Sequence, residues 1–167
     1  LLAISKPYRL KRLLSFLDPW KNPSEEGYHI IQSLYALGSG GLIGVGIGQS
    51  RQKFFYLPEP QTDFIFSVIG EELGFIGAAF VIIAFMFFIW RGYRTAMAAP
   101  DMFGKLMATG ITTLIALQFL INIAVVTASV PVTGMPLPFI SYGGSSLTIT
   151  MCQIGILLNI SRYAEVK

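Results

Sequence analysis

Charged residues are scarce in this sequence. Only 13% of its 167 residues are charged and 53% are hydrophobic, whereas a soluble domain carries about 25% charged residues. From Leu106 to Ser161 there is no Asp, Glu, Lys, Arg or His. A water-soluble fold cannot hide so long an uncharged stretch, because it needs charged surface to stay dispersed. The deficit therefore indicates a protein whose solvent is lipid.

Cysteine is nearly absent too. The single Cys152 excludes an internal disulfide, and its apolar surroundings predict a small buried side chain. The chain begins with Leu1 inside the apolar run 1–4 and shows no signal peptide pattern, so we expect the end of a preceding membrane span there. The basic residues are scattered around apolar segments without forming a stripe, which argues against a nucleic acid partner.

Three segments approach the length of about 20 apolar residues that a membrane-spanning helix needs. They are Leu73–Trp90, Leu106–Ala128 and Leu147–Ile160. The third reaches full length only if Phe139–Ser146 also lies at membrane depth. We therefore predict an all-α integral membrane protein, a polytopic helical bundle. It divides into 1–72, the end of a preceding span plus a large extracytoplasmic loop, and 73–167, three transmembrane helices with a cytoplasmic loop and tail.

Basic residues set the predicted orientation. Arg91, Arg94 and Lys105 lie between the first two spans, and Arg162 and Lys167 follow the third. Positive residues accumulate on the cytoplasmic side of membrane proteins. The loop and the tail are therefore predicted to be cytoplasmic, which places residues 5–72 outside.

The external loop is predicted to carry short amphipathic helices. Leu10, Leu13, Leu14 and Leu17 repeat at helical spacing beside basic residues, which is typical of a helix on a membrane surface or of one packed on other protein. A second helix should begin after Ser24 and end at Gly38–Gly41. The glycine-rich stretch that follows matches no nucleotide-binding fingerprint, and we interpret it as flexible or closely packed backbone.

Asp63 is the strongest candidate for chemistry. It enters the apolar aromatic run Phe64–Phe66, and desolvation there would raise the pKa of a carboxylate and make it a better base near neutral pH. A carboxylate near a membrane is a functional candidate by default. Capping of the following helix is an alternative of equal weight.

Four other polar side chains have two interpretations each. Arg51 and Lys53 precede Asp63 and suit a pyrophosphate leaving group, although each alone is more simply a solvated flank. Gln118 and Asn122 share one face of the second span. Interhelical hydrogen bonding is their simpler role, and lining a substrate cavity is the alternative.

Three motifs carry a family resemblance. Tyr56–Phe66 followed by Gly70–Gly74, and Pro138–Ser146, resemble the two signatures of the SEDS family (shape, elongation, division and sporulation; FtsW, RodA and SpoVE). Gly27–Gly41 matches the preceding loop. The resemblance covers essentially the whole chain, and Asp18–Trp20 with Phe54–Asp63 favours the FtsW/SpoVE branch.

The resemblance implies a peptidoglycan glycosyltransferase that polymerises lipid II into glycan strands at the outer face of the bacterial cytoplasmic membrane during division or sporulation. The essential acidic residue of the family falls on Asp63, as the base that deprotonates the acceptor hydroxyl. Implied partners are lipid II, the nascent glycan strand, a class B penicillin-binding protein and other divisome or sporulation membrane proteins. A divalent cation, Mg²⁺ or Mn²⁺, would neutralise the leaving group, and no organic cofactor is implied.

Together these arguments define a candidate site. Asp63 is the catalytic candidate. Candidates for substrate binding are Arg51, Lys53, Glu59, Thr62, Gln118, Asn122, Ser141, Tyr142, Gly143, Gly144, Ser145 and Ser146. Part of the family's cavity, including a basic partner for the Asp, comes from helices that this sequence lacks, so we expect the fragment alone to be inactive. Two rival functions remain, a lipid II flippase and a non-catalytic scaffold for a class B penicillin-binding protein.

Overall fold

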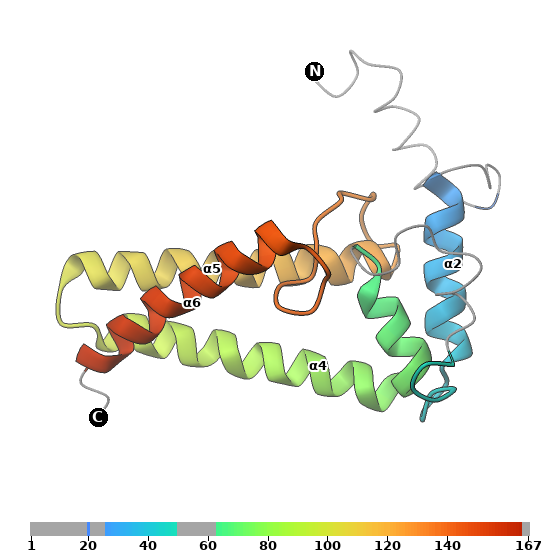
Figure 1. Cartoon of the computed structure of the whole chain (residues 1–167), viewed down its shortest axis with the longest axis horizontal. Coiled ribbons are helices and arrows are strands. Elements are labelled where there is room, and N and C mark those ends of the chain that lie inside the picture. Colours follow the sequence, from blue (N-terminus) through green and yellow to red (C-terminus); the bar gives the residue numbers. More distant parts are fainter. Residues whose placement is uncertain (1–19, 21–25, 50–62, 165–167) are drawn as a thin grey trace, which may run out of the picture.

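The structure is a computed structural model that describes Trp20, residues 26–49 and residues 63–164. This part of the chain contains four helices and no strand: α2 (Glu26–Ser39), α4 (Ile65–Ala98), α5 (Met102–Val126) and α6 (Gly144–Tyr163). In Figure 1, α4, α5 and α6 run along the long axis of the molecule, and α2 crosses one end. The predicted all-α fold is confirmed.

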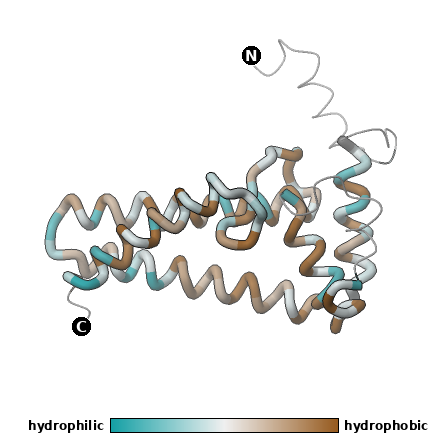
Figure 2. The backbone as a smooth tube through the Cα atoms, in the orientation of Figure 1, coloured by the Kyte–Doolittle hydropathy of each residue, from teal (hydrophilic) through white to brown (hydrophobic). Residues whose placement is uncertain are grey.

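Three of these helices, α4, α5 and α6, are long and apolar enough to cross a membrane. Helices α4 and α6 extend beyond the predicted spans at both ends, because polar and small residues there are helical too. Helix α5 begins before the predicted Leu106 but ends at Val126, short of the predicted Ala128. The third span reaches full length by including Gly144–Ser146 at its start. Brown, apolar residues dominate the middle of these helices in Figure 2, and the tips are paler or teal. The prediction of three transmembrane helices is confirmed.

Helix α4 is broken near its start. Gly74 has φ 67° and ψ −166°, outside the helical region, and φ in this range favours glycine. A break leaves backbone groups without partners inside the helix, which is costly where no water is available. In Figure 1 the short first part of α4 lies beside α2, and the chain then turns into the long second part.

The glycine-rich loop after α2 supplies the missing partners. Val45 N donates to Glu71 O at 3.0 Å, and Phe75 N donates to Gly41 O at 2.9 Å. A Cβ on Gly74 would overlap the backbone of the loop at Gly44 N. Of the two interpretations of this stretch, the structure selects close backbone packing.

Helices α4 and α5 form an antiparallel hairpin that holds most of the core. Phe85 of α4 stacks on Phe119 of α5 with ring centroids 4.2 Å apart and planes 12° from parallel. Further along, Gly92 lies against the fully buried Thr112, because small residues let helix backbones approach closely in membranes. Helix α5 is the central one, with 44% of an apolar 18-residue window buried against 11% for the corresponding windows of α4 and α6.

The segment between α5 and α6 folds back onto this hairpin. Leu137 is 1% exposed, and the ring of Phe139 lies 5.7 Å from that of Phe88 in an edge-on contact. Phe139 has φ 67°, a conformation that costs a non-glycine residue energy. The packing of its ring compensates for that strain and anchors the segment.

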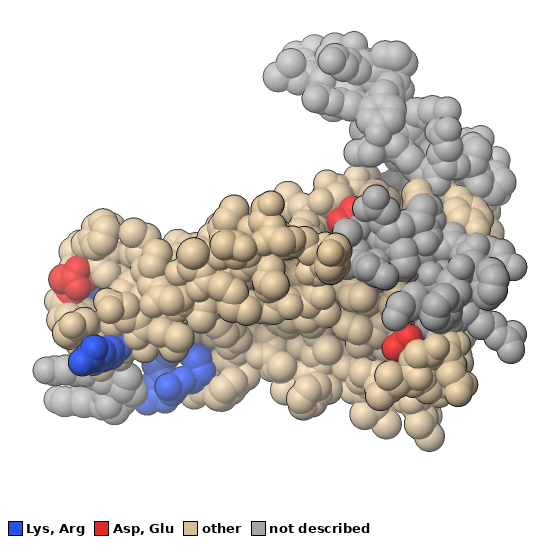
Figure 3. Space-filling view, viewed as in Figure 1, with Lys and Arg blue, Asp and Glu red and all other residues tan. Residues whose placement is uncertain are grey.

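Charge is distributed unevenly along the bundle. Within the described residues the cations are Arg91, Arg94, Lys105 and Arg162. Figure 3 shows blue atoms near one end only, whereas red atoms occur at both ends. These cations lie around the α4–α5 turn and at the end of α6, so two predicted basic regions share one end of the molecule.

Two smaller predictions have clear outcomes. The helix expected between Ser24 and Gly41 is α2, and it is confirmed. Cys152 is exposed rather than buried, because α6 turns only Thr150 and Leu157 into the protein. The amphipathic helix containing Leu10–Leu17 lies outside the described residues.

Candidate functional site around Asp63

Asp63 lies just before α4, at the end of the bundle opposite the α4–α5 turn. The N-cap residue of α4 is Phe64, which makes no side-chain cap hydrogen bond, so Asp63 is not the N-cap. The side chain of Asp63 is half-buried. Its carboxylate therefore sits at an edge between packed protein and solvent.

The backbone of Asp63 is tied to α5 and to the segment after α5. Asn122 Nδ2 donates to Asp63 O at 2.9 Å and to Met135 O at 2.8 Å. Asn122 is 1% exposed, so the donor end of both bonds is shielded from water. One amide thus joins three segments that are distant in sequence.

The carboxylate of Asp63 faces the segment that precedes α6. Gly134 has φ 70°, and a Cβ built on it would lie 3.6 Å from Asp63 Oδ2. The backbone of Gly134 therefore forms one side of the site. Sequence reasoning did not single out Gly134, although a glycine between Thr133 and Met135 in an uncharged loop is a signal of special backbone geometry.

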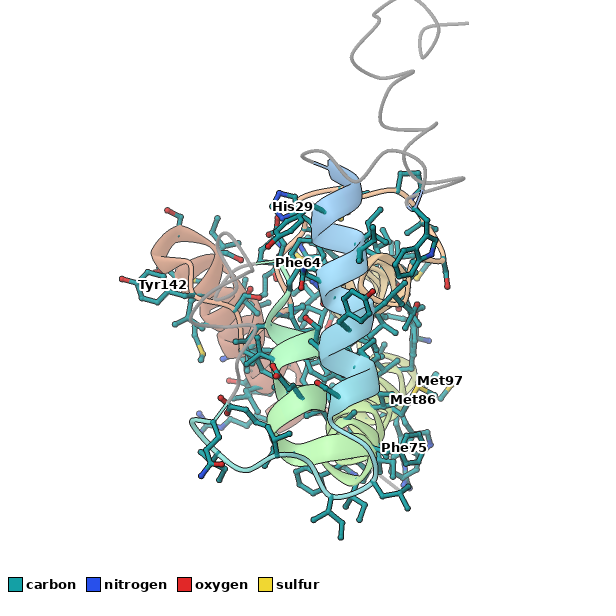
Figure 4. The ribbon with its side chains drawn as sticks, turned by 90° about the vertical axis from the view of Figure 1, so that its right-hand side faces the viewer. His29, Phe64, Phe75, Met86, Met97 and Tyr142 are labelled. Carbon is teal, nitrogen blue, oxygen red and sulfur yellow. The ribbon has the colours of Figure 1, made fainter. Side chains whose placement is uncertain are left out.

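His29 reaches the same region from α2. Its ring stacks on Phe64 with centroids 6.0 Å apart and planes 19° from parallel. Figure 4 shows His29 and Phe64 close together beside α2. Only the fold brings this histidine of α2 against Phe64, the residue that follows Asp63.

The second signature lies at the start of α6. Ser141 is buried, and its Oγ accepts a hydrogen bond from Leu137 N at 2.7 Å. Tyr142 is 77% exposed and points away from the bundle in Figure 4. Gly143 is the N-cap residue of α6, and Gly144, Ser145 and Ser146 form its first turn. This signature combines an internally bonded serine with an exposed tyrosine.

The other predicted binding residues are placed differently. Gln118 is half-buried one turn before Asn122. Arg51, Lys53, Glu59 and Thr62 lie outside the described residues. Substrate binding by any of the twelve candidates stays a prediction.

The described residues do not form a metal centre. Among residues 26–49 and 63–164, no three His, Cys, Asp or Glu side chains gather closely enough to hold a metal ion. The divalent cation stays a prediction.

The sequence matches the cell cycle protein family FtsW/RodA/SpoVE over residues 1–166. The chain belongs to this family. Asp63, which contacts α5 and the segment before α6, belongs to the first of the motifs that predicted this family.

The named relatives include SpoVE and FtsW proteins, as the sequence motifs predicted. It is 59% identical to stage V sporulation protein E of Bacillus subtilis (strain 168), over 98% of this chain and 45% of that protein. It is 51% identical to the probable peptidoglycan glycosyltransferase FtsW of Geobacter sp. (strain M18), over 96% of this chain and 44% of that protein. The chain spans less than half the length of these relatives.

Solved structures agree with the family assignment. A chain of a peptidoglycan synthase complex that coordinates polymerization and crosslinking matches with TM-score 0.73 and 30% identity, covering 98% of this family member and 44% of that chain. A mutant of the rod shape determining protein RodA of Thermus thermophilus matches with TM-score 0.62 and 32% identity, over 81% and 41%. The predicted family is confirmed.

Proposed function

We propose that this chain contributes the catalytic carboxylate of a peptidoglycan glycosyltransferase that joins lipid II units into glycan strands. The name of one relative, the probable peptidoglycan glycosyltransferase FtsW of Geobacter sp. (strain M18), supports the activity. The name of stage V sporulation protein E supports a role in sporulation. The observation that carries the proposal is the placement of Asp63, half-buried at the bundle end away from the described cations. A base must reach both a membrane-bound substrate and water.

In the proposed reaction, the Asp63 carboxylate removes the proton from a sugar hydroxyl of the acceptor. The hydroxyl oxygen then attacks the anomeric carbon of the donor and forms the new glycosidic bond. The bond between that carbon and the pyrophosphate breaks, and undecaprenyl pyrophosphate leaves with the electron pair. The proton remains on Asp63 until solvent removes it.

The proposed setting is the outer face of the bacterial cytoplasmic membrane. The positive-inside rule supports this orientation, because Arg91, Arg94 and Lys105 lie at the α4–α5 turn and Asp63 at the other end. A class B penicillin-binding protein is the proposed partner that crosslinks the strands. The similarity to a chain of a complex that coordinates polymerization with crosslinking supports such a partner.

A flippase and a scaffold are the competing functions. Neither needs a base, so neither explains a half-buried carboxylate whose own backbone carbonyl accepts a hydrogen bond from the buried Asn122. The discriminating change is Asp63→Asn, which removes the negative charge and keeps the shape.

The experiment uses a chain with the full length of the relatives and purified lipid II. Asp63→Asn should reduce strand synthesis by about 100-fold to 10,000-fold, the usual contribution of a general base. Lipid II flipping, measured separately in vesicles, should be unchanged. Strand synthesis at the wild-type rate would eliminate Asp63 as the base, and loss of flipping alone would favour the transporter.

A further inference from the structure

Asn122 lies behind the backbone of Asp63, inside the protein. It is 1% exposed, and its contacts are to backbone carbonyls rather than to the carboxylate. Nδ2 has two hydrogens, and the two bonds to Asp63 O and Met135 O use both. The side chain of Asn122 therefore fixes the position of the Asp63 backbone relative to the segment that contains Gly134.

The other end of the Asn122 amide supports this interpretation. Oδ1 is buried and accepts no hydrogen bond within the described part of the chain. Burying an unpaired acceptor costs free energy, and an apolar residue of similar volume would avoid that cost. An amide nevertheless occupies this position, and only its nitrogen forms hydrogen bonds. This indicates that the two bonds donated by Nδ2 are the role of Asn122.

Asn122 connects two backbone segments that no hydrogen bonds of a single helix could hold together. Asp63 precedes the first turn of α4, and 59 residues separate it from Asn122. Gly134 lies beside Asp63 Oδ2 and directly precedes Met135, whose carbonyl accepts the second bond. One amide thus sets both the backbone that carries the carboxylate and the backbone that faces it.

We propose that Asn122 is a positioning residue for Asp63. It holds the carboxylate and the Gly134 backbone in one geometry, so that the base meets the acceptor hydroxyl at the correct distance. This inference rests on the proposed glycosyltransferase function. Because a displacement of about 1 Å can cost about 100-fold in rate, loss of the two bonds should lower turnover strongly while leaving substrate affinity nearly unchanged.

The test is Asn122→Leu in a chain with the full length of the relatives, assayed with purified lipid II. We expect kcat to fall about 100-fold and KM to stay within about threefold, because an interaction that acts only in the transition state changes kcat. Retained kcat would overturn the proposal. A raised KM with unchanged kcat would also overturn it, because that result would make Asn122 a substrate contact.

Ser33→Ala is the matched control. Ser33 is fully buried, and its Oγ donates to Val126 O at 2.9 Å, so this variant also removes a shielded hydrogen bond near the end of α5 but leaves Asp63 alone. Its Tm should fall, as that of Asn122→Leu does, while its kcat stays near wild type. An equal loss of kcat in Ser33→Ala would show that any loss of stability lowers kcat, and would overturn the proposal.

Two further variants keep the result decisive. If Asn122→Leu does not fold, Gly134→Ala replaces it, since a side chain at φ 70° shifts the backbone that faces Asp63 Oδ2, and the same kcat and KM criteria apply. Asp63→Asn is assayed in parallel. If Asp63→Asn is inactive and Asn122→Leu is active, only the positioning role fails, whereas an active Asp63→Asn removes the proposed base itself.

Discussion

Gly74 determines the bend in α4, the helix that follows Asp63. Its φ of 67° bends α4 between the short part that follows Asp63 and the long membrane-spanning part. The glycine loop packs against the bend so closely that a Cβ on Gly74 would lie 2.7 Å from Ile43 C and overlap Gly44 N. The bend therefore needs glycine for two reasons, its backbone conformation and its lack of a side chain.

Gly74→Ala should destabilise the protein by about 1–3 kcal/mol from backbone strain alone, with the steric overlap adding to it. Gly110→Ala in α5 is the matched control, because a Cβ there meets no atom within 4 Å. Thermal unfolding in detergent should show a lower Tm for Gly74→Ala and an unchanged or higher Tm for Gly110→Ala. Equal Tm values would mean that the bend tolerates a side chain.

At the scale of elements, the α4–α5 hairpin supports the site. Asn122 belongs to α5 and Asp63 leads into α4, so any change in how the two helices pack moves one relative to the other. The stacked pair Phe85 and Phe119 lies at the centre of this contact. Its aromatic packing fixes the position of α5 on which Asn122 depends.

Phe119→Ala should cost about 3–5 kcal/mol of stability, because it leaves a cavity in the buried contact between the helices. Leu117, two residues earlier on the same helix, is 51% exposed, so Leu117→Ala removes a side chain of the lipid-facing surface and should cost much less. Unfolding measured by steric trapping in bicelles would compare the two. A larger effect for Leu117→Ala would contradict the assignment of the buried face.

At the scale of the whole molecule, the two ends of the bundle differ in charge and in chemistry. Described cations lie around the α4–α5 turn and the end of α6. Asp63, Asn122 and Gly134 gather at the other end. The proposed function requires this second end to face the extracytoplasmic side.

Cysteine labelling in intact cells tests that orientation. In a Cys152→Ser background, Met102→Cys places a thiol at a site that is 69% exposed at the α4–α5 turn, and Thr133→Cys places one in the exposed segment before α6. A membrane-impermeant maleimide should label position 133 directly and position 102 only after permeabilisation. The reverse pattern would put Asp63 on the cytoplasmic face and contradict the proposed reaction.

Much of this architecture could be predicted from local patterns. Hydropathy alone located α4, α5 and α6. In lipid each helix must satisfy its own backbone hydrogen bonds and present apolar side chains, whatever its neighbours are. The terminal turns were missed because polar and small residues there carry no hydropathy signal. Glycine spacing indicated special backbone at 41–48, but it could not distinguish flexibility from close packing.

Local patterns were enough to predict a membrane protein, its spanning segments and an unusual carboxylate, Asp63, beside an apolar run. These properties follow from composition and periodicity within short windows. Three contacts became known from the fold alone: Asn122 donates to the backbone of Asp63, Gly134 faces its carboxylate, and a glycine loop fills the break in α4. Each of these contacts joins residues far apart in the chain, and their pairing depends on how the helices pack rather than on any local pattern.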